Sequence, residues 1–123
     1  MKINNIDHTT LYVNSIDSVI KFYAELFEFT VTPGVSEDGR YLMVENDQIH
    51  FFILEDASIS KKFIAKQHLS FSVPSLKPVY EQLKSMGVSY QRGTFNGFKK
   101  RNFDWCEWID PEGIRLECVE HID

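Results

Sequence analysis

The chain has 123 residues, of which 43% are hydrophobic and 25% charged, a composition typical of one soluble globular domain. Its formal net charge of −5 argues against a nucleic-acid-binding protein. No apolar run approaches the length of a membrane span, and the N-terminus lacks the apolar core of a signal peptide. The two cysteines have no zinc-ligand spacing, so we expect a cytoplasmic protein with reduced thiols.

The chain opens with an alternating stretch over residues 6–13 that predicts a strand with two different faces. A helical apolar pattern follows over residues 16–27, with Ser15 placed to cap its start. Turn signals lie at Pro33-Gly34, Asp38-Gly39 and Asn46-Asp47. Further strands are expected at residues 29–31, 41–45 and 48–54. The predicted order is therefore β-α-β-β-β.

A polar connector over residues 56–66 precedes a second stretch with the same order of elements. A strand is expected at residues 67–73, and a helix capped by Ser75 follows, with Pro78 in its first turn and Gly87 as its stop. The remaining strands are expected at residues 89–91, 102–109 and 114–119. A long loop over residues 92–101 and a tight turn at Asp110-Pro111-Glu112-Gly113 separate them.

The two stretches are copies of one unit, because equivalent residues recur at a constant offset. The matching pairs are His8 and His68, Val13 and Val73, Ser15 and Ser75, and Val19 and Val79. We therefore predict an α+β fold of two tandem β-α-β-β-β modules, whose curved mixed sheets enclose a metal or ligand cavity. Residues 1–123 form a single domain, with module one at about 4–55 and module two at 67–121.

Strand alternation divides the side chains into an apolar set beneath the helices and a polar set on the other face of each sheet. The helix-free face is predicted to collect His8, Thr10, Tyr41, His50, His68, Trp105, Glu107, Arg115 and Glu117. So many polar and aromatic side chains are typical of the wall of a cavity rather than of a core.

Two histidines and one carboxylate from three strands, His8, His68 and Glu117, make a facial metal triad with open positions for water or substrate. A divalent Mn, Fe, Ni or Zn ion suits these donors. The alternative is that each histidine is a satisfied structural residue. The placement of both histidines at equivalent repeat positions, with Glu117 on the matching face, favours the metal site.

The other residues of this face have two interpretations each. Glu107 is a general base near the metal, or a carboxylate paired with Arg115. Tyr41 and Trp105 stack on a ligand, or fill the mouth of the cavity. His50 is a fourth ligand or a hydrogen-bonding wall residue. We assign substrate binding to Tyr41, His50, Trp105 and Arg115.

A basic run, Lys99-Lys100-Arg101, has the charge to steer an anionic substrate toward the cavity. The alternative, which is commoner for such runs, is a solvated hairpin.

Several of these stretches resemble the vicinal oxygen chelate superfamily, which includes glyoxalase I, bleomycin-resistance proteins and extradiol dioxygenases. The resemblance is carried by residues 7–13, 22–29, 68–71 and 110–117, and spans nearly the whole chain. It implies that the family's metal ligands fall on His8, His68 and Glu117. The ligand pattern is most similar to that of fosfomycin-resistance thiol transferases, which share Thr10 and thereby imply a catalytic role for it.

The chain departs from the family pattern at several positions. Glyoxalase I enzymes carry a fourth ligand, commonly glutamate, on the fourth strand, where this chain offers His50. The thiol transferases carry an arginine beyond the last strand that this sequence lacks. Glu28 occupies the place of a glycine that usually ends the first helix. Glu107 stands where the thiol transferases carry a tyrosine.

The resemblance implies a small metal-dependent enzyme that acts on an oxygen-chelating substrate, as a lyase, isomerase, thiol transferase or dioxygenase. The alternative is a metal-free protein that binds a drug or metabolite. A small molecule is the expected ligand, with no nucleic acid or membrane as partner. Related small proteins also imply a homodimer with a shared site, in which one subunit supplies His8 and the other supplies His68 and Glu117.

Overall fold

A computed structural model describes residues 1–97 and 101–122. Lys99 and Lys100 of the basic run lie outside the described residues. The chain divides into two compact units, Met1–Ile64 and Ala65–Asp123. Across the described ranges, no helix combines the length and the apolar character needed to cross a membrane.

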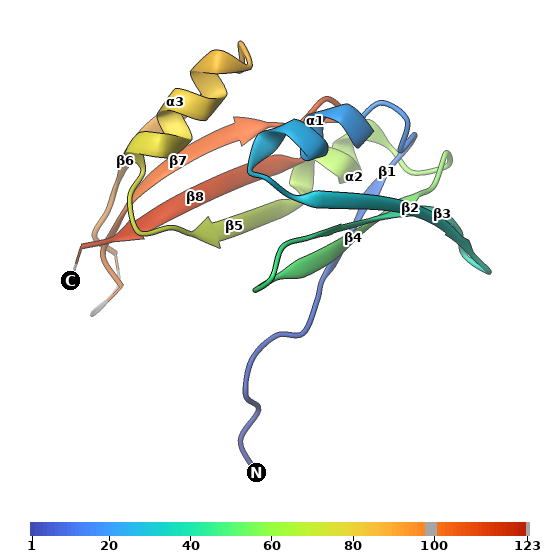
Figure 1. The fold of residues 1–123 in the computed structure, drawn as a ribbon, viewed down its shortest axis with the longest axis horizontal. Helices are drawn as coiled ribbons and strands as arrows, with labels where there is room; N and C mark the ends of the chain where they lie inside the picture. The colour runs from blue at the N-terminus through green and yellow to red at the C-terminus, as the bar shows by residue number, and fades with distance from the viewer. Residues whose placement is uncertain (98–100, 123) are drawn as a thin grey trace. The chain divides into compact units, whose positions relative to one another are not determined.

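The first unit contains a four-stranded sheet in the order β1-β4-β3-β2 (Figure 1). Its elements are β1 (Thr10–Val13), α1 (Ile20–Leu26), β2 (Thr30–Ser36), β3 (Gly39–Glu45) and β4 (His50–Glu55). The short helix α2 (Lys61–Lys66) follows, where the sequence predicts a polar connector.

The second unit repeats this plan, with a four-stranded sheet in the order β5-β8-β7-β6. Its elements are β5 (His68–Ser72), α3 (Lys77–Ser85), β6 (Gln91–Phe95), β7 (Phe103–Ile109) and β8 (Arg115–His121). The predicted α+β class and the two β-α-β-β-β modules are therefore confirmed.

Each sheet is mixed, because its first strand pairs in parallel with its last strand and the other pairs are antiparallel. β1 pairs with β4, with Thr10 opposite Phe52. β5 pairs with β8, with Ser70 opposite Glu117. A parallel pair requires a crossover connection, which the helix and the two intervening strands supply in each unit.

The side chains that alternate toward the helices form the core of each unit. In the first unit they include Leu11, Val13, Tyr23, Leu26, Leu42, Val44, Phe51 and Ile53. In the second unit they include Val79, Leu83, Cys106, Trp108, Ile114, Leu116 and Cys118. Figure 1 shows α3 lying across one face of its own sheet. The opposite face of each sheet therefore carries the polar set, as the alternation predicts.

The two cysteines are core residues on neighbouring strands. Cys106 lies opposite Cys118, and both side chains are buried with free thiols. Burial raises the pKa of the Cys106 thiol to about 11 and that of the Cys118 thiol to about 12. Both thiols therefore stay protonated at neutral pH and act as apolar core groups.

A carboxylate on the last strand of each unit holds the start of the helical segment. The Ile16 N–H donates to Glu55 Oε2 at 3.0 Å, and the Leu76 N–H donates to Glu120 Oε1 at 2.8 Å. The prediction that Ser15 caps α1 is wrong, since α1 begins at Ile20 with Val19 in the capping position.

The start and the end of α3 agree more closely with the sequence prediction. Ser75 Oγ accepts the Lys77 N–H at 3.3 Å, although Leu76 occupies the capping position. Pro78 lies in the first turn, and Gly87 ends the segment with a φ of 70°.

Two strand boundaries differ from the sequence pattern because the strands lie at sheet edges. Pro33 and Gly34 do not form a turn but lie within β2, an edge strand where a missing N–H can face away from the sheet. The sixth strand is Gln91–Phe95 rather than 89–91, so the predicted loop over 92–101 begins later. An edge strand has one neighbour, and so needs no strong alternation of its own.

β1 and β4, which adjoin His8 and His50, begin later than the sequence pattern predicts. β1 begins at Thr10 rather than at residue 6, and β4 begins at His50 rather than at residue 48. The side chain of Ile49, just before β4, is 40% exposed. Asn46 Oδ1 accepts the backbone N–H groups of Gln48 and Ile49 at 2.8 and 2.9 Å, which draws both residues into the turn.

The predicted turn between β7 and β8 is built around the buried side chain of Asp110. Its Oδ1 accepts the N–H groups of Glu112, Gly113 and Ile114 at 2.8, 2.9 and 3.0 Å. Gly113 has a φ of 112°, which glycine tolerates without strain. This turn sets the register that brings Glu107 opposite Glu117.

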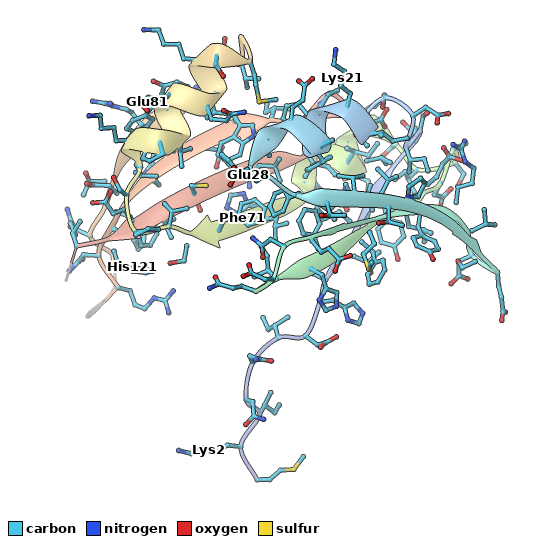
Figure 2. The ribbon with its side chains drawn as sticks, in the orientation of Figure 1. Lys2, Lys21, Glu28, Phe71, Glu81 and His121 are labelled. Carbon is cyan, nitrogen blue, oxygen red and sulfur yellow. The ribbon has the colours of Figure 1, made fainter. Side chains whose placement is uncertain are left out.

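Figure 2 shows Glu28 where α1 gives way to β2. Its φ of 58° is in the left-handed region, the conformation that glycine supplies at the end of many helices. A side chain there costs about 1 kcal/mol or more relative to glycine.

We therefore expect Glu28→Gly to raise the free energy of unfolding by about 0.5–1 kcal/mol, after the greater freedom of glycine in the unfolded chain is subtracted. Glu25→Gly is the matched control, because Glu25 lies inside α1. It should lower the free energy of unfolding by about 1 kcal/mol. Urea denaturation measures both, and a loss of stability in Glu28→Gly would contradict the strain argument.

Candidate metal centre

Three side chains of types that can bind a metal meet on the helix-free face of the second unit: His68 from β5, Glu107 from β7 and Glu117 from β8. The parallel pairing of β5 with β8 places His68 opposite Arg115, two residues from Glu117 on the same face. The antiparallel pairing of β7 with β8 places Glu107 directly opposite Glu117. Strand register alone therefore brings the three groups together.

The donor atoms of this group lie close together. His68 Nε2 lies 3.3 Å from Glu117 Oε1, and His68 Nδ1 lies 3.9 Å from Glu107 Oε2. One donor atom from each residue lies within 4.8 Å of the other two. Glu117 has the most enclosed side chain, with 13% of its surface exposed.

These residues fit a divalent ion by donor chemistry and by spacing. Imidazole nitrogen with carboxylate oxygen suits Mn, Fe, Ni and Zn. Two ligands that each lie about 2.1 Å from a metal are about 3 Å apart in octahedral geometry. The 3.3 Å between His68 Nε2 and Glu117 Oε1 is close to this separation.

Two carboxylates face each other in this group, and like charges directly opposite on neighbouring strands repel. Arg115 Nη1 lies 3.9 Å from Glu107 Oε1 and offsets part of the negative charge. Arg115 is therefore both the predicted partner of Glu107 and a cation beside the candidate metal position.

A second group lies on the first unit and contains His8. His8 Nδ1 lies 2.8 Å from Asp7 Oδ2, and His50 Nε2 lies 3.6 Å from the same oxygen. The two imidazole rings stack with centroids 5.8 Å apart. The hydrogen bond from His8 holds the pKa of the Asp7 carboxyl below its usual range. Asp7, His8 and His50 thus form a three-donor group of their own.

Phe52 organises the ring side chains on this face of the first unit. The rings of His8, His50 and Tyr41 each meet the Phe52 ring edge-on, at centroid distances of 5.3, 6.1 and 5.9 Å. His50 is therefore a neighbour of His8, as both interpretations of the sequence require.

Within the second unit, the structure brings the predicted residues His68 and Glu117 together, and Glu107 lies on the Nδ1 side of His68. Within the first unit, His8 lies beside Asp7, a residue that the sequence pattern did not indicate. The position of Asp7 next to His8 is the sequence feature that could have indicated it. Strict strand alternation, however, predicts that the two side chains lie on opposite faces.

The predicted aromatic residues each cover a glycine on an edge strand. Gly34 lies opposite Tyr41, and Gly93 lies opposite Trp105. A Cβ at Gly93 would come within 2.7 Å of the Trp105 ring, and a Cβ at Gly34 would overlap the Tyr41 ring. Each ring therefore rests on the backbone of its own sheet, and the glycine is required for this close approach.

Thr10 is the first residue of β1, and its exposed side chain lies on the strand that follows His8. It pairs with Phe52 across the ladder, which places it on the face that carries the imidazole groups. Its hydroxyl is available to a ligand bound on that face.

A separate polar hollow of about 400 Å³ lies on the other face of the second sheet, at the start of α3. Tyr80, Arg92, Asp104 and Glu120 line it among others. Arg92 lies opposite the buried Cys106, so this hollow and the His68 group are on opposite faces. The hollow therefore belongs to the helix packing rather than to the candidate metal centre.

Comparison with known proteins agrees with this fold. A family model described as the Glyoxalase/Bleomycin resistance protein/Dioxygenase superfamily matches residues 5–118. No curated protein sequence matches the chain. Among similar solved structures, a glyoxalase family protein from Enterococcus faecalis has 19% identity and a TM-score of 0.77, with 98% of this chain and 100% of that chain covered.

Two further similar structures have names that refer to antibiotics. TnmS3, an antibiotic binding protein from Streptomyces sp. CB03234, has 17% identity and a TM-score of 0.74, with 99% of each chain covered. The fosfomycin resistance protein FosX from Listeria monocytogenes has 16% identity and a TM-score of 0.72, with 98% of this chain and 94% of that chain covered. At these identities the likeness establishes the fold. Because the family model covers most of the sequence, the chain belongs to the Glyoxalase/Bleomycin resistance protein/Dioxygenase superfamily.

Proposed function

We propose that the chain is a small cytoplasmic metal-dependent enzyme that acts on an oxygen-chelating substrate, with His8, His68 and Glu117 as the metal ligands. The observation that carries this proposal is the approach of His68 Nε2 to within 3.3 Å of Glu117 Oε1. Membership of the superfamily supports it, as does the equivalent repeat position of His8. The reaction class is that of a lyase, isomerase, thiol transferase or dioxygenase.

Each residue of the helix-free face has a role in this proposal. His8, His68 and Glu117 would hold the divalent ion, and its chemistry there would be that of a Lewis acid toward negative charge on the substrate oxygens. Glu107 accepts a proton from the substrate, with Arg115 holding its other oxygen and any anionic group of the substrate. Thr10 offers its hydroxyl to a substrate oxygen. His50 contributes to the wall beside His8.

We also propose that the site is shared in a homodimer, with His8 from one subunit and His68 and Glu117 from the other. The separation of the donors into two groups, one on each unit, is what this arrangement needs. A symmetric dimer then contains two equivalent sites.

The alternative is a metal-free protein that binds an aromatic drug or metabolite. The Trp105 ring, resting flat on Gly93, and the Tyr41 ring, resting on Gly34, supply stacking surfaces for such a ligand. The similarity to an antibiotic binding protein adds to this alternative. Metal content distinguishes the two functions most directly.

In a metal titration, alanine variants of His8, His68 and Glu117 should each lose a stoichiometric divalent ion while their circular dichroism spectra remain native. His50→Ala should weaken binding to a smaller extent. His121→Ala is the matched control, because His121 lies at the exposed end of β8 (Figure 2) and should retain full binding. A wild-type protein that binds no divalent ion would exclude the enzyme and favour the binding protein.

If Glu107 is the general base, Glu107→Gln should reduce turnover by about a hundredfold or more with the metal retained, because the amide cannot accept the proton. Turnover is measured on a substrate that the wild-type enzyme converts, and metal content by elemental analysis. Glu81→Gln, on the exposed side of α3, is the control and should be fully active. An unchanged rate in Glu107→Gln would exclude Glu107 as the general base.

For the shared site, the test is to refold His8→Ala together with Glu117→Ala. Neither homodimer has a complete site, but a mixed dimer has one complete site and one doubly defective site, so half of the wild-type metal binding per mixed dimer should return. The control pair is His68→Ala with Glu117→Ala, whose defects lie on the same half of the site and cannot complement each other. Mixed dimers that form without any return of binding would place the site within one chain.

A further inference from the structure

We infer that Asp7 is a positioning residue for His8: its carboxylate holds the Nδ1–H side of the imidazole ring and leaves Nε2 as the free ligand atom. The inference rests on the proposed function, since it assigns the atom with which His8 would bind the metal. Asp7 is not a member of the proposed ligand set. It acts on the site only through His8.

The distance between the two side chains determines which nitrogen carries the hydrogen. His8 Nδ1 lies 2.8 Å from Asp7 Oδ2, a hydrogen-bond distance. A neutral imidazole has one N–H donor and one acceptor nitrogen, whereas an ionised carboxylate only accepts. The short contact therefore requires the hydrogen on Nδ1, and the lone pair that a metal needs is on Nε2.

His8 needs such a partner because it lies outside the strand. β1 begins at Thr10, and the last backbone bond to β4 joins the Phe52 N–H to the Thr9 carbonyl at 2.9 Å. The ladder therefore does not orient the ring of His8. Asp7 orients the His8 ring from one side. The edge-on contact with the Phe52 ring restricts the His8 ring from another side.

His50 strengthens the hold on Asp7. Its Nε2 lies 3.6 Å from the same Oδ2 that contacts His8, and its ring stacks on the His8 ring at an interplanar angle of 23°. Asp7 is 81% exposed, so its carboxylate would swing freely without these two imidazole neighbours. His50 thus acts as a support for Asp7, with its Nε2 turned to the carboxylate.

The second unit repeats the same order of atoms around its own histidine. Glu107 Oε2 lies 3.9 Å from His68 Nδ1, and Glu117 Oε1 lies 3.3 Å from His68 Nε2. The Nδ1 side of each ring therefore faces a carboxylate, and in His68 the Nε2 side faces the second ligand. The contact to Glu107 is longer than a hydrogen bond, so Asp7 fixes its histidine more tightly than Glu107 does.

The test is long-range ¹H–¹⁵N NMR of the full-length, metal-free protein with labelled histidine, at a pH where the rings are neutral. His8→Gln assigns the His8 signals. Wild-type His8 should be the Nδ1–H tautomer, and Asp7→Ala should shift it to a mixture of tautomers. Asp7→Asn should preserve the tautomer, because the amide oxygen still accepts the hydrogen bond. Asp38→Ala, in the exposed turn between β2 and β3, is the matched control and should have no effect.

Zinc titration of the same variants gives a second measurement. Asp7→Ala should weaken Zn²⁺ binding by about 10- to 100-fold, with most of the affinity restored in Asp7→Asn.

Two results would overturn the inference. One is a His8 tautomer that is the same in Asp7→Ala as in wild type. The other is an equal loss of Zn²⁺ affinity in Asp7→Ala and Asp7→Asn, which would make Asp7 itself a ligand. A wild-type protein that binds no Zn²⁺ but keeps an Asp7-dependent Nδ1–H tautomer would refute the metal site and uphold the role of Asp7.

Discussion

The parallel pairing of the first and last strands in each module is the constraint on which the candidate site depends. It inserts β8 between β5 and β7, so residues separated by most of a module become direct neighbours. His68 opens the module and Glu117 closes it, yet their side chains lie 3.3 Å apart. An antiparallel meander of the same strands would place the first and last strands at opposite edges, and this group would not form.

The two modules repeat specific contacts as well as strand order. In each, the last strand offers a carboxylate to the N–H that starts the helical segment, from Glu55 in one and Glu120 in the other. In each, an edge-strand glycine also receives an aromatic ring from the neighbouring strand. The carboxylate contacts attach the helical crossover to the sheet. The glycine–ring contacts hold the edge strand against its neighbour. The ring contacts lie on the helix-free face, which also carries the candidate metal centre.

Electrostatics on that face favours a bound cation. Glu107 and Glu117 lie opposite each other on neighbouring strands, a costly arrangement unless positive charge offsets it. Arg115 approaches only one of the two, at 3.9 Å from Glu107. A divalent ion bound by His68 and Glu117 would relieve the repulsion more completely. Repulsion of this kind is typical of functional sites, where local stability is exchanged for binding.

The sequence by itself determined the strand faces, the repeat and the Asp110 turn, because each depends on local periodicity or turn chemistry. It also indicated His68 and Glu117 as partners, and the family resemblance marked Glu28 as standing in the place of a helix-ending glycine. Only the tertiary structure decided the edge-strand assignment of Pro33 and the start of α1 beside Glu55. It also decided the grouping of Asp7 with His8 and of Glu107 with His68. These features depend on which strands become neighbours and where their ladders end, and a periodic pattern along one chain carries no information about either.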